Sequence, residues 1–286
     1  MNHFSARDSR NRFLPYFLLL PVLAFAVVFK LYPIFYSVIS GFHFKGVLSF
    51  RTYELMFQDS VFWNSFWVTV RMNLIMTPLQ IVLSLILALM VNNAIKGIGV
   101  FRSIFYLPVT ISMPVAAICF SMILSYNNGV ANTILNAMNI GTQGFFNDKS
   151  QAMACIILLC TWKGCGYWMM FFLAGLKGID ESLYEAAKMD GAGFFASLFH
   201  VTLPMLRRTT LFVMVADTST NLLLFAPMKL ITDGGPRGTT DVLMYEAYRQ
   251  AFKYGNYNKG SAITGILIVF ILVIVMLQFR LMADRD

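Results

Sequence analysis

The chain has 286 residues, of which 58% are hydrophobic and only 13% are charged. Soluble domains usually carry about 25% charged residues, so this composition excludes an ordinary water-soluble globular protein. The net charge of +8 does not indicate a nucleic-acid-binding protein, because no RNA- or DNA-binding motif accompanies it. Lipid is the alternative solvent, and we expect an all-α, polytopic bundle of membrane helices.

Six apolar stretches are predicted to cross the membrane, each close to or longer than the roughly 20 residues that a helix needs. They are too long and too evenly apolar for the strands of a membrane barrel, which alternate over about 10 residues. Helices satisfy their own backbone groups in lipid, so a single transmembrane helical domain is predicted. The predicted spans are residues 13–41, 64–93, 101–125, 152–176, 210–231 and 261–279.

The first apolar stretch follows Arg7, Arg10 and Arg12, as the core of a signal peptide would. It is long, contains several prolines and lacks a small-residue cleavage site, so we interpret it as an uncleaved span. With both termini in the cytoplasm, the cytoplasmic segments carry more basic residues than the outer ones. This modest positive-inside bias favours cytoplasmic termini.

Neither catalytic residues nor a metal site are predicted. The sequence lacks the P-loop pattern GxxxxGK[ST] as well as HExxH and GxSxG, and no carboxylate pair lies at helical spacing within one span. The four cysteines lie inside predicted spans without CxxC spacing, as small apolar side chains would. If the protein moves a solute uphill, the energy must therefore come from a partner or from an ion gradient.

The most patterned polar segment is the loop 177–208 between the fourth and fifth predicted spans. Ser182 and Glu185 have capping-box spacing and predict the start of a short helix. Gly191 can adopt a left-handed conformation and would end this helix. A second helical stretch, 194–202, precedes Pro204, which is expected to break or redirect the chain. On these grounds alone the short helix is either a docking element for another protein or an ordinary interfacial anchor.

This loop resembles the EAA motif of the permeases of binding-protein-dependent ABC importers. The matching residues are Glu185, Ala186, Ala187, Asp190, Gly191, Leu203 and Pro204. A second stretch, from Thr232 through Gly234-Gly235-Pro236 to Gly260, resembles the sugar-uptake subgroup of maltose and glycerol-3-phosphate type. Leu14-Pro15-Tyr16, with Pro33, is also typical of this subgroup.

The resemblance implies a permease subunit in a bacterial cytoplasmic (inner) membrane, with both termini cytoplasmic. Its EAA loop would be a coupling helix that docks on a cytoplasmic ATPase, with Glu185 as polar anchor and Gly191 as the turn. The implied partners are a second homologous permease, two ATPase copies, an extracytoplasmic solute-binding protein and a sugar. ATP and Mg would bind to the ATPase, and no cofactor to this chain. Transport would follow alternating access.

Three charged residues fall inside predicted spans, namely Arg71, Lys163 and Asp217. Charges in the membrane interior are costly and are therefore functional candidates. Asp217, Thr220, Asn221 and Leu224 recur at helical spacing, so they are expected to share one face that looks into a water-filled cavity. Two alternatives remain open: Lys163 and Asp217 form an ion pair that only joins two spans, or Lys163 or Arg71 contacts an acidic sugar.

The resemblance to maltose-type permeases implies that nine positions contact the sugar. They are Val109, Met113, Lys163, Gly164, Tyr167, Asp217, Thr220, Asn221 and Leu224. Only Gly164, Tyr167 and Asn221 match the maltose permease chemically, which puts maltose itself in doubt. Trp162 and Tyr167 could stack on a sugar ring, and Asp217 and Asn221 could hydrogen-bond its hydroxyls.

Three other functions are weighed against a sugar permease. An ABC permease for a non-sugar solute would share the EAA loop but not the Gly-Gly-Pro segment. A secondary transporter often contains inverted repeats, and no repeat relates the two halves of this sequence. A purely structural scaffold leaves the polar run 217–221 unexplained.

Overall fold

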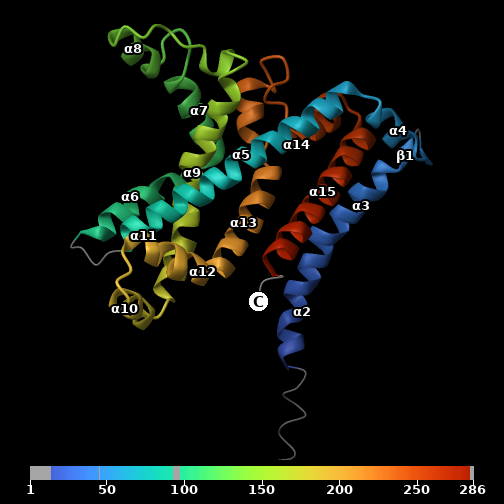
Figure 1. Cartoon of the computed structure of the whole chain (residues 1–286). Helices are drawn as coiled ribbons and strands as arrows, with labels where there is room; N and C mark the ends of the chain where they lie inside the picture. The colour runs from blue at the N-terminus through green and yellow to red at the C-terminus, as the bar shows by residue number, and fades with distance from the viewer. Residues whose placement is uncertain (1–13, 45, 93–96, 284–286) are drawn as a thin grey trace, which may run out of the picture.

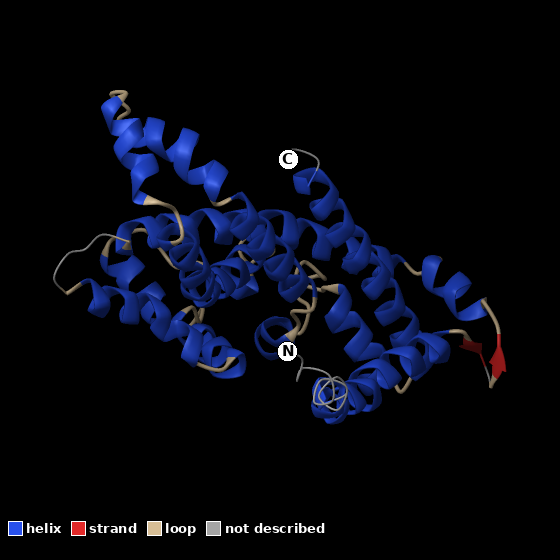
Figure 2. Ribbon diagram, turned by 90° about the horizontal axis from the view of Figure 1, so that it is seen from below, coloured by secondary structure: helices blue, strands red, loops and turns tan. Residues whose placement is uncertain are grey.

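The computed structural model describes residues 14–44, 46–92 and 97–283. The described part is almost entirely helical, which confirms the all-α prediction. Its only strands are β1 (His43–Phe44) and β2 (Val47–Leu48), an antiparallel hairpin at the periphery (Figure 2). Several residues used in the predictions lie outside the described part: Arg7, Arg10, Arg12, Phe13, Lys45, Asn93, Lys96 and Arg285.

The first predicted span forms one long apolar rod, built from α2 (Leu14–Ala26), the π-helical turn η1 (Val27–Leu31) and α3 (Tyr32–Gly41). It packs against the last predicted span, α15 (Tyr257–Ala283), and Figure 1 shows α3 and α15 side by side. A Cβ at Gly41 would lie 3.0 Å from the Ala262 Cα. A glycine is thus needed at this crossing. The described side chains of α2 are nearly all exposed, as expected for a helix in lipid or against another subunit.

The second predicted span is α5 (Ser60–Val91), which follows α4 (Arg51–Phe57) and is N-capped by Asp59, whose side chain accepts a hydrogen bond from Val61 N at 2.8 Å. One stripe of its buried residues is small and polar and lies beside buried apolar side chains such as Met72 and Met76, whereas Leu74 and Ile75 point outward. Small and polar residues let membrane helices approach closely. The helix packs along α9 (Ala152–Lys177), the fourth predicted span. The small and polar residues of α5 are Ser65, Thr69, Asn73, Thr77, Gln80, Ser84 and Ala88.

The third predicted span is a pair of helices, α6 (Ile98–Thr110) and α7 (Met113–Ile123), bent by 97° at the intervening residues. Ile111 and Ser112 are extended, and Pro114 lies in the first turn of α7, where its missing N–H costs no hydrogen bond. Beyond α7, helix α8 (Val130–Ala137) and the 3₁₀ turn η2 (Phe145–Asn147) lead into α9.

The fifth predicted span, 210–231, is not one continuous helix. Helix α13 (Arg207–Leu222) ends directly after the polar run 217–221, and the π-helical turn η4 (Met228–Thr232) begins after Pro227. Among the described residues, four helices are long and apolar enough to cross a membrane, or five if α6 and α7 count as one broken span. At 16 residues, α13 is shorter than the roughly 20 residues of a full crossing. The sixth crossing stays a prediction.

The segment between η4 and α15 is anchored by buried charges. It contains α14 (Leu243–Tyr248) and the π-helical turn η5 (Arg249–Lys253). The Arg249 guanidinium forms ion pairs with Asp241, at 2.5 Å, and with Glu246. Both carboxylates are almost fully buried. The Gly-Gly-Pro segment is tied to the neighbouring chain by Thr240, whose hydroxyl donates to the Gly235 carbonyl at 2.7 Å.

Candidate solute-binding site and coupling loop

All nine residues predicted for the solute path line one cavity of about 200 Å³. Val109, at the end of α6, and Met113, at the start of α7, reach it because the third predicted span bends between them. The other seven come from α9, from α13 and from the residues just after α13. The full lining is Gln80, Val109, Met113, Cys160, Lys163, Gly164, Tyr167, Trp168, Asp217, Thr220, Asn221 and Leu224.

Asp217 is the centre of a buried hydrogen-bond network in this cavity's wall. Its side chain is 1% exposed. One carboxylate oxygen accepts a hydrogen bond from Trp168 Nε1 at 2.6 Å, and the other accepts one from Asn221 Nδ2 at 3.0 Å. The same Asn221 amide donates to Thr77 Oγ1 at 3.1 Å and to Gln80 Oε1 at 2.9 Å.

This network joins α5, α9 and α13 to one another. The hydrogen bonding of Asp217 and Asn221 to sugar hydroxyls stays a prediction, although both Asp217 oxygens and the Asn221 amide nitrogen already have protein partners. Buried polar groups of this kind are stable only when their hydrogen bonds are made. Both side chains therefore fix the shape of the cavity wall.

Three lining residues were missed by the sequence analysis: Gln80, Cys160 and Trp168. Gln80 is 2% exposed and donates from Nε2 to the Cys160 carbonyl at 3.0 Å. It thereby ties α5 to α9 and, through Asn221, to α13. A polar side chain in the middle of a long apolar run was the available signal. Within the second predicted span, only the charged Arg71 was a candidate.

Lys163 lines the cavity but does not pair with Asp217 in the described structure. Its Nζ donates instead to the Val109 carbonyl at 3.2 Å. The predicted alternative of a Lys163–Asp217 ion pair between two spans is therefore wrong. Arg71 is exposed on the surface of α5 and is not among the lining residues.

Two of the predicted path residues, Tyr167 and Thr220, are exposed. Tyr167 is 42% exposed and packs edge-on against Trp168. Thr220 is exposed, although its hydroxyl donates to the Ala216 carbonyl of its own helix at 2.8 Å. Trp162 packs on Phe120 with ring centroids 5.3 Å apart and lies outside the lining. Tyr167 therefore remains the aromatic candidate for a sugar ring.

The predicted coupling helix is α10 (Glu181–Met189). It begins two residues earlier than expected: Asp180 is the N-cap and accepts a hydrogen bond from Ser182 N at 3.0 Å. The predicted capping box from Ser182 to Glu185 is therefore wrong. That backbone hydrogen bond also lowers the pKa of the exposed Asp180.

Gly191 ends α10 as predicted, with a left-handed φ of 77°. Ala192 N donates to the Ala187 carbonyl at 2.9 Å, which closes the helix end in the manner of a Schellman turn. No residue of α10 is buried, and Glu185 and Ala186 are both exposed. The helix thus presents its surface to solvent or to a partner.

The second half of the loop is a run of short helical pieces: α11 (Phe194–Ser197), the π-helical turn η3 (Leu198–Thr202) and α12 (Leu203–Met205). Pro204 was expected to break or redirect the chain, but the helical path continues through it. Pro204 occupies the first turn of α12, where no amide donor is needed. The chain turns at Leu206 instead. Leu203 and Pro204 thus continue the loop's helical path.

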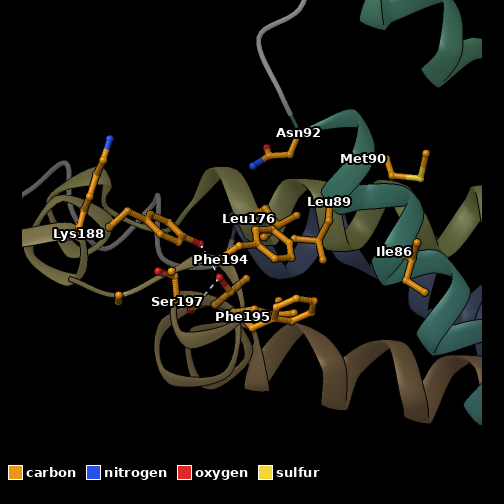
Figure 3. A pocket seen from close by; sticks show the side chains of 14 residues that line it. Ile86, Leu89, Met90, Asn92, Leu176, Lys188, Phe194, Phe195 and Ser197 are labelled. Carbon is orange, nitrogen blue, oxygen red and sulfur yellow. Dashed lines mark hydrogen bonds between the residues drawn. The ribbon is translucent and has the colours of Figure 1, made fainter. Parts of the chain in front are cut away.

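The loop is held to the bundle beside a second cavity, of about 810 Å³ (Figure 3). Tyr184 and Thr202 join the two halves of the loop by a hydrogen bond of 3.0 Å between their hydroxyls. Phe194 and Phe195 extend from the loop toward the ends of α5 and α9, where Leu89 and Leu176 lie. A movement of α10 would therefore reach the ends of both helices through α11 and η3.

Residues 80–286 match the family model described as "Binding-protein-dependent transport system inner membrane component". The lactose transport system permease protein LacF of Rhizobium radiobacter is 34% identical over 275 residues, covering 93% of this chain and 92% of LacF. The probable ABC transporter permease protein YurN of Bacillus subtilis is 30% identical over 283 residues, covering 95% of this chain and 97% of YurN.

The fold is also similar to solved structures. A bacterial ABC transporter that imports the acidic polysaccharide alginate contains a chain with TM-score 0.86 and 24% identity, covering 98% of each chain. The alginate transporter in complex with its alginate pentasaccharide-bound periplasmic protein matches with TM-score 0.86 and 25% identity, covering 96% and 95%. This chain belongs to the family of binding-protein-dependent transport system inner membrane components, the permeases of ABC transporters.

Proposed function

We propose that this chain is the permease subunit of an ATP-driven importer that passes a sugar or oligosaccharide from an extracytoplasmic binding protein to the cytoplasm. The observation that carries the proposal is the single cavity that gathers all nine predicted path residues. Relatives whose names specify sugars, such as lactose and alginate, support this substrate class.

The proposal assigns solute passage to the cavity and coupling to the ATPase to the loop that contains α10. α10 would dock on a cytoplasmic ATPase through its exposed face, with Glu185 as the polar anchor. The chain has no P-loop of its own, so ATP and Mg would bind to that ATPase, and this chain would bind no cofactor and catalyse no reaction. Movement of the docked helix would be passed to the ends of α5 and α9.

The proposed assembly contains a second homologous permease, two ATPase copies and the binding protein. One chain has one coupling helix, whereas two ATPase copies need two. The solute would pass between the two permeases by alternating access. Both termini would lie in the cytoplasm, on the same side of the membrane as α10.

The proposal is tested by purifying the tagged chain from its native membrane in mild detergent and identifying its partners by mass spectrometry. Recovery of a second permease with an EAA loop and of a P-loop ATPase is the expected result. A reconstituted complex should then hydrolyse ATP faster when a sugar-loaded binding protein is added. Recovery of the chain alone, with uptake driven by an ion gradient, would contradict the proposal and favour a secondary transporter.

A further inference from the structure

Lys163 is the only lysine or arginine among the described residues that line the 200 Å³ cavity. An ammonium group has three N–H donors. One of them is directed at the Val109 carbonyl, 3.2 Å away, and no carboxylate in the described part of the chain forms an ion pair with it. The positive charge therefore faces the cavity without a negative partner.

The carboxylate of the same cavity does not neutralise this charge. Both oxygens of Asp217 accept hydrogen bonds from neutral donors, Trp168 and Asn221. Asp217 is also almost fully buried, whereas Lys163 is only partly buried. A solute that enters the cavity thus meets the accessible ammonium group of Lys163. The carboxylate of Asp217 is almost fully buried and is hydrogen-bonded to Trp168 and Asn221.

From this arrangement we infer that the transported solute is an acidic sugar, and that Lys163 binds its anionic group. The inference rests on the proposed sugar-transport function. A neutral sugar would offer Lys163 only hydroxyl dipoles. A carboxylate, sulfonate or phosphate would add charge–charge attraction to the hydrogen bond, and this attraction grows in a cavity shielded from water. Tyr167, one helical turn further along α9, is placed to contact the sugar ring beside the charged group.

Lys163 also makes a structural contact with the Val109 carbonyl, and the test must separate this contact from solute binding. Val109 lies in the last turn of α6, and a lysine that donates to a carbonyl there stabilises the helix end. Lys163→Gln keeps a donor for this carbonyl and removes the charge. Lys163→Arg keeps the charge. If Lys163 acts only by donating to this carbonyl, the Lys163→Gln variant should bind sugars like the wild type. If Lys163 binds an anion, only the Lys163→Arg variant should bind them like the wild type.

The experiment uses the permease complex purified with its partners, without the binding protein, so that only the permease selects the ligand. Binding of digalacturonate and of neutral galactobiose, which lacks the carboxylates, is measured by titration calorimetry. The variants are Lys163→Gln and Lys163→Arg, with Lys149→Gln as control. Lys149 is exposed and does not line the cavity. Uptake of both sugars into proteoliposomes with the complete transporter is measured in parallel.

The inference predicts that the wild-type complex binds the acidic disaccharide more tightly than the neutral one. Lys163→Gln should weaken acid binding about tenfold or more without changing neutral binding, since only the acidic sugar loses a charge–charge attraction while glutamine keeps a hydrogen-bond donor. Lys163→Arg and Lys149→Gln should retain the preference. A preference for the neutral sugar, or equal losses for both sugars in Lys163→Gln, would overturn the inference and leave the proposed function intact. Absence of any sugar-coupled uptake would defeat both.

Discussion

The indole Nε1 of Trp168 donates a 2.6 Å hydrogen bond to the carboxylate of Asp217, and both side chains are buried between α9 and α13. The helices that line the cavity are therefore joined by a polar contact inside an apolar protein. If a buried carboxylate loses such a donor, the free energy of its desolvation is no longer offset, and the folded state is destabilised. The cavity wall consequently depends on an indole that does not itself need to touch the solute.

Trp168→Phe should destabilise the protein, because it preserves an aromatic ring but removes the donor to Asp217. We expect a loss of about 1–3 kcal/mol in unfolding free energy. Unfolding of the purified protein in detergent, followed by tryptophan fluorescence or by thermal shift, measures the loss. Trp162→Phe is the matched control, since Trp162 is 41% exposed and packs on Phe120. Equal stability of the two variants would show that the hydrogen bond contributes little.

Gly191→Asp should abolish sugar-stimulated ATP hydrolysis while leaving membrane insertion intact. The φ of 77° is unfavourable for a residue with a side chain, at a cost of about 1 kcal/mol, and the new carboxylate changes the docking surface. No atom lies within 4 Å of a Cβ at Gly191, so crowding would not explain a defect.

Gly193→Asp is the control for that experiment. Gly193 lies on the same loop, also has free space around a Cβ, and has an ordinary φ of −77°. It should retain more of the coupled ATP hydrolysis, measured in proteoliposomes with the ATPase and a loaded binding protein. Normal coupling in Gly191→Asp would remove the support for α10 as a coupling helix.

Gly166→Ala should disrupt the packing of α6 on α9. A Cβ at Gly166 would lie 2.1 Å from the Phe105 carbonyl oxygen, which is backbone and cannot rotate away. Overpacking of this kind typically costs about 1–3 kcal/mol. Gly178→Ala, at the end of the same helix, meets no atom closer than 3.4 Å and should be tolerated. The yield of folded protein on size-exclusion chromatography and the unfolding temperature compare the two. Similar values would contradict the close approach of α6.

The charged cluster around Arg249 should make stability depend on pH. Burial raises the pKa of Asp241 from 3.8 to about 6, although Arg249 opposes the shift. The folded chain therefore keeps this proton between about pH 4 and 6, where the unfolded chain has released it. The resulting stabilisation is present below the unfolded pKa of 3.8 and is lost as the pH rises through about 6. Its size is on the order of 3 kcal/mol, at about 1.4 kcal/mol per pKa unit.

Asp241→Asn should remove this part of the pH dependence, so that wild-type stability falls relative to the variant between about pH 4 and 6. Thermal unfolding in detergent at several pH values measures the difference. Asp148→Asn is the control, because hydrogen bonds from Ser150 lower the pKa of Asp148. The Asp148 contribution is instead lost on acidification through its folded-state pKa, below 3.8. A wild-type profile parallel to that of Asp241→Asn would show that Asp241 titrates normally.

The sequence by itself determined the helical membrane class and the family resemblance, and that resemblance supplied the nine predicted path positions. Helical periodicity placed Asp217, Thr220, Asn221 and Leu224 on one face, and they do share one cavity. The glycine at position 191 marked the end of α10 because few other residues accept a left-handed backbone. Composition, periodicity and turn chemistry are local properties, so a single sequence expresses them directly.

Only the tertiary structure decided which polar groups are partnered and which are accessible. The ion pair between Lys163 and Asp217 was plausible from sequence, but Trp168 and Asn221 occupy the carboxylate, and Lys163 reaches a carbonyl of α6. Gln80 joins α5 to α9 across 80 positions of sequence. Such contacts depend on how the helices cross and where the third span bends, and hydropathy carries no information about either. Packing, which brings distant residues together, thus set the chemistry of the cavity.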